Sequence, residues 1–412
     1  MTVITGRRRI GKTTLIKKAC EGYAMIYFFV GRKSESLLCA ELVEEIKAKL
    51  GLDIGDFNSF PRLLQVIMEI SKNRHLVLVL DEFQNFKFVN ASIFSDMQNI
   101  WDKQKEGARM HLVLCGSVQT MMEKIFDDKR EPLYGRANNR IALRPFTTSV
   151  LIEILRDHNK NFTPDDLLTL YITTGGVAKY VEEMIDHNAV DKESMIREYF
   201  CVSSYFLPEG KDMLNDEFGR DSINYCSILS AIASGHNERG VIKSFTDIEP
   251  VGFLDRLEKN YNLIYRYRPY GSSDKSQNVH YGITDMFLCF WFRFAHKYNS
   301  AIEMGTMEYV IGKVLADYET YSGRMLEMYF RQRYGETGRY NIVTNYWDSK
   351  GENEIDLIAV DENEREMIFA EIKRNPHRIS ISELETKAKN LVAKKRVYKV
   401  RYIGLSLDDM TK

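Results

Sequence analysis

This 412-residue chain has no closely spaced cysteine pairs, no long apolar run and almost no net charge. Its six cysteines are scattered without a C-x-x-C pair, which argues against a zinc site or a disulfide framework and indicates a reducing compartment. The longest apolar runs, at 76–80 and 286–292, are far shorter than the roughly 18–20 residues of a membrane helix. The start has no apolar signal region. We therefore expect a cytoplasmic protein without a membrane segment.

The formal net charge of −1 means that no global field draws the molecule onto nucleic acid, so any such contact must come from a local patch. The length predicts two to four domains, since domains have roughly 100–200 residues. Residues 1–145 alternate helical patterns with continuous apolar runs, as in a parallel sheet buried on both faces. The expected strands lie at 24–30, 75–80 and 110–115, after a first short strand at 2–5. Gly22 and Gly51 are expected to cap the helices that precede them. The pattern predicts an α/β domain.

Three further segments follow. Residues 146–215 are helical, with Thr163 as an N-cap, and are expected to form a small lid. Residues 216–297 combine three helices with a β-hairpin around the polar turn 271–277, which is typical of a winged helix-turn-helix. Residues 298–412 start with a long helix, expected at 308–333. Two strands, expected at 354–360 and 366–373, follow it. A basic helix and a final strand, expected at 397–405, close the chain.

The stretch GRRRIGKTT fits the pattern G-x-x-x-x-G-K-[ST] between a strand and a helix. Backbone N–H groups of such a loop bind phosphate oxygens, Lys12 is expected to reach the β and γ phosphates, and the Thr13 hydroxyl is expected to bind Mg²⁺. An ordinary glycine turn is the alternative, and the three arginines fit a solvated rim better than a second phosphate site. The residues predicted to bind nucleotide here are Gly6, Arg7, Arg8, Arg9, Ile10, Gly11, Lys12, Thr13 and Thr14.

Two acids, Asp81 and Glu82, end the buried strand LVLVL, at the sheet edge where doubly wound sheets place ligands. Asp81 is expected to hold Mg²⁺ through its water shell, and Glu82 to polarise the attacking water as a general base. The alternative is a pair of capping acids. Ser117 ends the next strand and is predicted to bind the water or the γ-phosphate. Arg136 is predicted to act as an arginine finger from its own subunit or from a neighbour, which implies a homo-oligomer; a solvated surface arginine is the alternative.

The stretches GRRRIGKTTL, LVLVLDEFQ, LVLCGS, PLYGR, TTGGVAKYV and YGITDMFLCFWFRF, in this order, resemble a family of archaeal and bacterial ATPases in the AAA-related, STAND-like P-loop group. The resemblance runs from residue 2 to about 375. It implies a helical lid, a winged helix and a C-terminal domain of unknown function, and it matches Arg136 to the family's YGR arginine. It also implies that Gly175 and Gly176 form a lid turn facing the nucleotide. The family turn usually reads G-G-x-P, whereas Ala178 stands here, which loosens the turn.

The start also departs from the family, whose members carry about a helix of chain with a GRE-like motif near the base. Either the start is truncated or misassigned, or base binding is reduced. We expect phosphate and Mg²⁺ binding to survive, with weaker adenine affinity and base selectivity.

Asp356 lies near the start of the strand at 354–360, and Glu371 and Lys373 share one face of the next strand. The two carboxylates are expected to share a Mg²⁺, and Lys373 to position or help deprotonate a water that attacks a phosphodiester. This is the D…E-x-K arrangement of the PD-(D/E)XK nucleases, and Glu327 matches the acid often found upstream in that fold. The alternatives are a polar rim on an edge hairpin, or a nuclease fold that does not cleave.

The segment 373–401 has ten Lys or Arg against two Glu, which suits a phosphate backbone, although a solvated helix is the alternative. The third helix of the winged unit mixes acids with bases, so this unit is either a DNA reader or a packing module.

Together these features predict an α/β protein with a P-loop NTPase (AAA-like) parallel sheet domain, a helical lid, a winged helix and a C-terminal α/β restriction-endonuclease-like domain. The predicted function is a Mg²⁺-dependent ATPase that uses ATP and controls a DNA-binding or DNA-cleaving domain. The alternative is a nucleotide switch that binds DNA or a protein without cleavage, and a third possibility is defective ATP binding.

Overall fold

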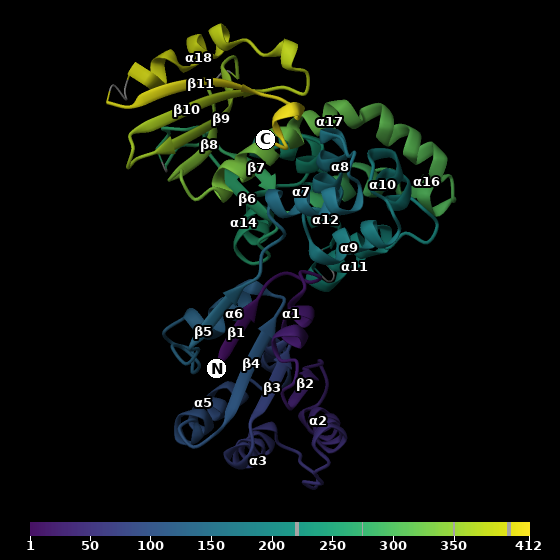
Figure 1. Ribbon diagram of the computed structural model, residues 1–412, viewed down its shortest axis with the longest axis vertical. Helices are drawn as coiled ribbons and strands as arrows, with labels where there is room; N and C mark the ends of the chain where they lie inside the picture. Colours follow the sequence, from purple (N-terminus) through teal and green to yellow (C-terminus); the bar gives the residue numbers. More distant parts are fainter. Residues whose placement is uncertain (219–221, 274, 349–350, 394–396) are drawn as a thin grey trace. The chain divides into compact units, whose positions relative to one another are not determined.

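The computed structural model describes residues 1–218, 222–273, 275–348, 351–393 and 397–412. The chain separates into two compact units, Met1–Arg144 and Pro145–Lys412 (Figure 1). In the described ranges, no helix has both the length and the apolar character needed to cross a membrane.

The first unit is a five-stranded, all-parallel sheet in the order β2-β3-β4-β1-β5. In the central strand β3, buried side chains alternate between the two faces: Leu78 packs in a cluster on one face, and Val77 and Val79 pack on the other. Both faces are therefore covered, as continuous apolar strands require. The elements are β1 (Thr2–Thr5), α1 (Lys12–Ala19), β2 (Met25–Phe29), α2 (Glu35–Leu50), α3 (Phe60–Asn73), β3 (Leu76–Asp81), α4 (Phe86–Val89), α5 (Ile93–Gln104), β4 (Met110–Gly116), α6 (Gln119–Asp127) and β5 (Asn139–Ala142).

The strand register brings the carboxyl ends of three neighbouring strands to one edge of the sheet. Thr5 at the end of β1 pairs with Gly116 at the end of β4, and Leu80 of β3 pairs with Leu114 of β4. The loop after β1, the acids after β3 and the serine after β4 therefore start from adjacent positions. This is the edge at which parallel α/β sheets bind ligands.

Two sequence expectations fail in this unit. Gly22 does not cap α1, because the helix already ends at Ala19 with Cys20 as its C-cap; Gly22 lies in the following turn at φ +85°. The strand β5 was not expected at all. Its four residues are all exposed, so they carry no apolar pattern, and pairing with β1 alone makes them a strand.

The second unit begins with helices and a hairpin that pack around one large apolar core. This core extends from Leu151 to Met410, so the segments expected as lid, winged unit and C-terminal domain share it. The aromatic run 286–295, which includes a π-helical turn at Trp291–His296, is almost wholly buried within it. The elements are α7 (Thr148–His158), α8 (Pro164–Thr174), α9 (Ala178–Asp186), α10 (Lys192–Tyr199), α11 (Phe206–Phe218), α12 (Ser222–Ala233), α13 (Arg239–Thr246), α14 (Val251–Lys259), β6 (Ile264–Tyr267), β7 (His280–Ile283), α15 (Met286–Phe290) and α16 (Asn299–Glu303).

A mixed four-stranded sheet in the order β11-β10-β9-β8 completes this unit. The strands β8, β9 and β10 are antiparallel, and β11 runs parallel to β10. Leu357 and Ala370 face the large core that contains α17, whereas Ile358 and Phe369 face α18, so the two helices cover opposite faces (Figure 1). The elements are α17 (Met307–Glu336), β8 (Ile342–Trp347), β9 (Glu354–Asp361), β10 (Glu366–Ile372), α18 (Ile381–Ala393) and β11 (Lys399–Leu405). The sequence predicted all of these except β8.

Candidate functional site

The loop between β1 and α1 has the backbone geometry of a tight cradle. Gly6 has φ +155°, and a Cβ placed on it would lie 2.9 Å from the carbonyl oxygen of Leu143. Gly11 is left-handed at φ +97° and directly precedes α1. A side chain at either position would be strained or would collide, so the two glycines of the predicted pattern are required by this loop. Around them, Ile10 is buried, whereas Arg8, Arg9 and Thr14 are exposed.

Lys12 is folded back over its own loop. Its Nζ donates to the carbonyl oxygens of Gly6 at 2.7 Å and Arg7 at 3.0 Å. Burial lowers the pKa of Lys12, and the carboxylates of Glu82 and Asp81 partly oppose that effect. A buried ammonium whose described hydrogen bonds go to carbonyl oxygens is suited to binding an anion such as a phosphate.

A tyrosine that the sequence did not single out connects Thr13 to Asp81. The Tyr27 hydroxyl lies 3.1 Å from the Thr13 Oγ1 and donates a short hydrogen bond to one carboxylate oxygen of Asp81. The other oxygen of Asp81 accepts from the backbone N–H of Glu82 at 2.9 Å. Burial, followed by the hydrogen bond to Asp81, raises the pKa of Tyr27, so the phenol keeps its proton and remains a donor. The hydroxyl of Thr13 and the carboxylate of Asp81 are hard oxygen ligands, the kind that Mg²⁺ prefers. Their shared contact with the Tyr27 hydroxyl keeps these two groups close to each other.

Glu82 is fixed by three donors. The Ser117 hydroxyl donates to its Oε2 at 2.7 Å, the Ser117 N–H contacts the same oxygen at 3.4 Å, and the Gln84 side-chain amide also donates to it. Glu82 itself has a left-handed backbone at φ +52°. A Cβ on Gly116 would lie 2.5 Å from Gln84 Oε1, so this glycine makes room for the amide. Ser117 donates to the predicted general base, and its expected contact with water or phosphate stays a prediction.

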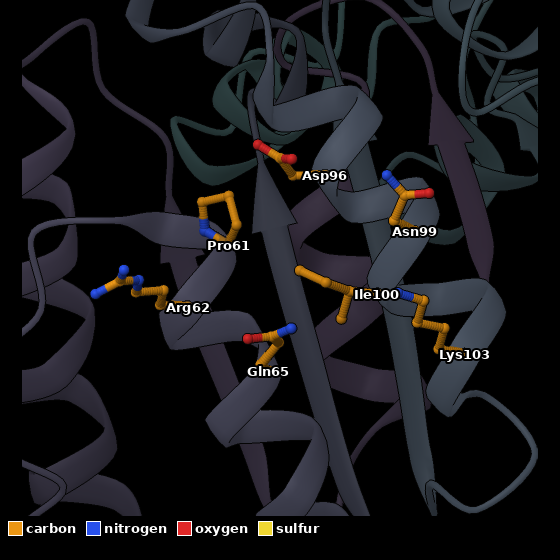
Figure 2. Close-up of a pocket in the computed structure, with 7 residues that line it drawn as sticks. All are labelled: Pro61, Arg62, Gln65, Asp96, Asn99, Ile100 and Lys103. Atoms are coloured by element: carbon orange, nitrogen blue, oxygen red, sulfur yellow. The ribbon is translucent and has the colours of Figure 1, made fainter.

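The predicted finger, Arg136, is paired elsewhere in the first unit. Its guanidinium donates to Asp102 Oδ2 of α5 at 2.9 and 3.3 Å and to the carbonyl oxygen of Tyr134 at 2.8 Å. A catalytic role would therefore require Arg136 to leave Asp102. A separate hollow of about 160 Å³ lies between α3 and α5, lined by Arg62, Gln65 and Asp96 among others, and contains none of the predicted site residues (Figure 2).

In the second unit, the hairpin β9–β10 brings Asp356, Glu371 and Lys373 together. Lys373 Nζ lies 3.0 Å from Asp356 Oδ2 and 3.9 Å from Glu371 Oε1. Asp356 Oδ2 also accepts from the Ile372 N–H at 2.8 Å, and Glu371 Oε2 accepts from the Ser380 N–H at 2.8 Å. Two nearly buried carboxylates thus converge on one cation, here the lysine ammonium. Among the described residues there is no group of three or more His, Cys, Asp or Glu side chains arranged to hold a metal.

Charge in this cluster favours a protonated lysine. Burial alone would lower the pKa of Lys373, but the carboxylates of Asp356 and Glu371 raise it above its ordinary value. Burial also raises the pKa of Glu327, on α17, to about 7. Arg331 contacts Glu327 Oε2 at 3.4 Å and donates to the Asp356 carbonyl oxygen at 2.6 Å. Lys373 is therefore better suited to positioning a water or phosphate than to removing a proton.

The residue after Lys373 points into the helical part of the unit. Arg374 donates to Asp165 Oδ1 at 2.8 Å and to the Ser322 hydroxyl at 2.8 Å. Asp165, on α8, also pairs with Lys192 at 2.9 Å. In the rest of the basic segment, Lys387 on α18 lies 3.9 Å from Glu371, and the basic residues at 394–396 lie outside the described residues.

The predicted glycine turn is present between α8 and α9. Gly175 and Gly176 are both left-handed, at φ +59° and +71°. The carbonyl oxygen of Gly176 accepts from the Phe146 N–H at 2.7 Å, and a Cβ on Gly176 would lie 2.7 Å from the Phe146 carbonyl oxygen. The turn closes without proline, and Ala178 begins α9. That the turn at Gly175 and Gly176 faces a nucleotide stays a prediction.

Comparison with known proteins identifies the character of the first unit. Residues 1–184 match a family described as an ATPase domain predominantly from Archaea, and residues 291–388 match archaeal and bacterial proteins of unknown function. The uncharacterized protein MJECL04 of Methanocaldococcus jannaschii is 28% identical over 387 residues, which cover 90% of this chain and 82% of that protein.

One solved structure supports the fold of this chain. The Walker-type ATPase PABY2304 of Pyrococcus abyssi superposes with a TM-score of 0.54 at 18% identity, over 71% of this chain and 90% of that one. The Aeropyrum pernix ORC2 protein, solved in ADPNP–ADP complexes, has a TM-score of 0.47 at 16% identity, over 76% and 88% of the two chains. Residues 1–184 of this chain thus match an ATPase domain family, and the first unit has the fold of a P-loop ATPase domain.

Proposed function

We propose that the chain is a Mg²⁺-dependent ATPase whose nucleotide state controls a C-terminal domain that acts on DNA. The observation that supports the ATPase half is the convergence of Lys12, Thr13, Asp81 and Glu82 at one edge of the sheet. When bound, Mg²⁺ would neutralise phosphate charge, and Thr13 and Asp81 are the residues that would hold it. Lys12 exchanges its carbonyl contacts for the phosphates, and Glu82 orients the attacking water.

For the C-terminal half, the supporting observation is the position of Lys373 between Asp356 and Glu371. The order of one helix, three antiparallel strands, a second helix and a parallel strand fits the nuclease-like fold expected from the sequence. In this proposal the two carboxylates hold a divalent cation, and Lys373 positions the phosphodiester. The four segments 1–145, 146–215, 216–297 and 298–412 are its proposed ATPase, lid, winged and nuclease-like parts.

Control of the second site by the proposed lid requires a physical connection within the second unit, and the pair Asp165–Arg374 supports one. Lys373 and Arg374 are neighbours in the chain, yet Lys373 faces Asp356 while Arg374 is bound to α8 of the proposed lid. A displacement of α8 would therefore pull on the end of β10. Because Asp165 is four-fifths buried, this ion pair is costly to break by removing one partner.

The second candidate function is a nucleotide switch that binds DNA or a protein without cleaving it. Lys373 is already ion-paired with Asp356, and the described residues contain no group of three or more His, Cys, Asp or Glu side chains that could hold a metal. Of the two proposed DNA contacts, the basic segment 373–401 is better supported than the winged unit, whose hairpin packs against β8.

The test is incubation of the protein with plasmid DNA and Mg²⁺ or Mn²⁺, with and without ATP. Cleavage that disappears in both Asp356→Ala and Lys373→Ala, and that changes with nucleotide in the wild type but not in Lys12→Ala, supports the proposal. Lys313→Ala, an exposed lysine on α17 outside the basic segment, serves as the matched control. Absence of cleavage under every nucleotide condition, together with nucleotide-dependent DNA binding, selects the switch.

A further inference from the structure

Gln84 lies two residues after the predicted general base, and its side chain is almost wholly buried in the first unit. Its amide nitrogen, Nε2, donates a short hydrogen bond to Glu82 Oε2. Because an ionised carboxylate only accepts hydrogen bonds, the NH₂ end of the amide faces Glu82 and the oxygen Oε1 faces away from it. The orientation of the Gln84 amide therefore follows from its acidic neighbour.

The amide oxygen of Gln84 is buried and has no hydrogen-bond partner among the described residues. It lies beside Gly116 at the end of β4, where an added Cβ would come within 2.5 Å of it. A buried acceptor without a partner lowers the stability of the fold, since water solvates the same group in the unfolded chain. An apolar side chain of equal length would avoid this loss, so packing alone does not explain a glutamine at this position.

The short turn that carries Gln84 is anchored on both sides. Phe83, which precedes it, is fully buried in the apolar core on one face of the sheet. Asn85, which follows it, donates through its side chain to the carbonyl oxygen of Val30 at 2.9 Å. The backbone N–H of Asn85 donates to the carbonyl oxygen of Glu82, also at 2.9 Å. The side chain of Gln84 therefore projects from a turn that both of its neighbours hold in place.

The hydrogen bonds to Glu82 all go to one of its two carboxylate oxygens. Gln84 donates to Oε2, and the hydroxyl of Ser117 donates to the same oxygen at 2.7 Å. Among the described residues, no hydrogen bond or ion pair goes to Oε1. Two side-chain donors on one oxygen fix the rotation of the carboxylate, because each bond is directional. Oε1 is therefore the oxygen that is available to an attacking water.

We propose that Gln84 is a positioning residue that, together with Ser117, holds Glu82 Oε2 so that Oε1 accepts a proton from the attacking water. The water gives this proton to Oε1 as its oxygen bonds to the γ-phosphorus and ADP leaves. A general base must lie within hydrogen-bond reach of the proton that it removes, so a carboxylate that rotates freely is less effective. Gln84 acts only through Glu82. The inference rests on the proposed function, because it specifies which atom of the general base acts.

The test is phosphate release by the full chain with ATP and Mg²⁺, measured as kcat and KM. Gln84→Met keeps the length of the side chain and removes the donor. We expect kcat to fall about 10–100-fold, whereas KM and the affinity for a fluorescent ATP analogue should not change. Gln119→Met is the matched control and should keep the wild-type rate. The exposed amide of Gln119 donates to Glu123 at 2.7 Å, so this variant loses a hydrogen bond of the same kind on α6.

A second comparison separates positioning from a general effect on the fold. In a Glu82→Gln background, Gln84→Met should leave the residual rate of a single turnover unchanged within about twofold, since its effect passes through Glu82. If melting shows that Gln84→Met does not fold, Ser117→Ala, which removes the other side-chain donor, is measured in the same two backgrounds. The inference is overturned if the variant hydrolyses ATP like the wild type, or if it slows hydrolysis equally in both backgrounds.

Failure of the proposed function gives a different result. If Glu82→Gln retains the wild-type rate, Glu82 is not the base, and both the proposed ATPase mechanism and the role of Gln84 are contradicted. If Glu82→Gln is slow and Gln84→Met is not, only the role of Gln84 is contradicted.

Discussion

Replacing Tyr27 by phenylalanine removes one hydroxyl that lies between Thr13 and Asp81. A hydrogen bond to a charged acceptor is worth about 1.5–3 kcal/mol, and each 1.4 kcal/mol is tenfold in an equilibrium constant. Asp81 is only half-buried, so water can take over part of this role and the lower end applies. Losing a residue that orients a metal ligand typically costs 10–100-fold in metal affinity. We expect Tyr27→Phe to raise the Mg²⁺ concentration for half-maximal nucleotide binding about tenfold.

The assay is equilibrium binding of a fluorescent ATP analogue, titrated with Mg²⁺ and repeated in EDTA. Affinity in EDTA should be unchanged, because the described contact of Tyr27 with the loop is to the side chain of Thr13, the predicted Mg²⁺ ligand, and Lys12 donates to other groups. Tyr23→Phe is the control, since Tyr23 is 65% exposed and lies just before the same strand. Equal Mg²⁺ midpoints for Tyr27→Phe and the wild type would refute the reasoning.

Three other outcomes are expected. Glu82→Gln should retain ATP binding but lower the hydrolysis rate by about 10²–10⁴-fold, measured as phosphate release; an unchanged rate would exclude Glu82 as the base. Gly116→Ala should destabilise the first unit by about 1–3 kcal/mol in thermal melting, because its Cβ collides with Gln84 and Met122, whereas Gly107→Ala meets nothing closer than 3.8 Å. Asp165→Asn should lower the free energy of unfolding in urea by about 2 kcal/mol at pH 7. Burial alone would raise the pKa of Asp165, but Arg374 and Lys192 lower this pKa below its ordinary value. The interactions of Asp165 therefore stabilise the fold above pH ~4, and this stabilisation is lost as the pH falls through the pKa of Asp165 in the folded protein.

The sequence alone identified the site residues that lie close together in the chain. It did not identify a residue whose role depends on the order of the strands in the sheet. Lys12 and Thr13 belong to one short pattern, and Asp81 and Glu82 end one apolar run, so each could be selected without knowing the fold. Tyr27 could not, because its role depends on β2 lying beside β3. That neighbour relation comes from sheet topology, which no pattern within β2 reveals.

Of the edge strands of the two larger sheets, β2 and β11 were predicted, whereas β5 and β8 were missed for a related reason. The strands β5 and β8 each pair on one side only, with β1 and β9 respectively. Their residues are mostly exposed or half-buried, and β8 mixes polar and apolar side chains, so neither shows the continuous apolar run of a buried strand. The strand conformation of β5 and β8 therefore depends more on the strands with which they pair than on their own residue composition.

The position of β8 also determines how the winged unit can be used. The segment after β6 contacts the backbone of β8, because the Tyr270 N–H donates to the Asn345 carbonyl oxygen at 3.0 Å. Trp347 at the end of β8 donates to Asn278 at 2.8 Å and stacks on His280 of β7. An exposed sheet edge invites pairing with other chains, so covering it is itself a structural role. A hairpin packed against β8 in this way is not available to follow a DNA groove, so under the proposed function the contacts with DNA would come from the basic segment 373–401.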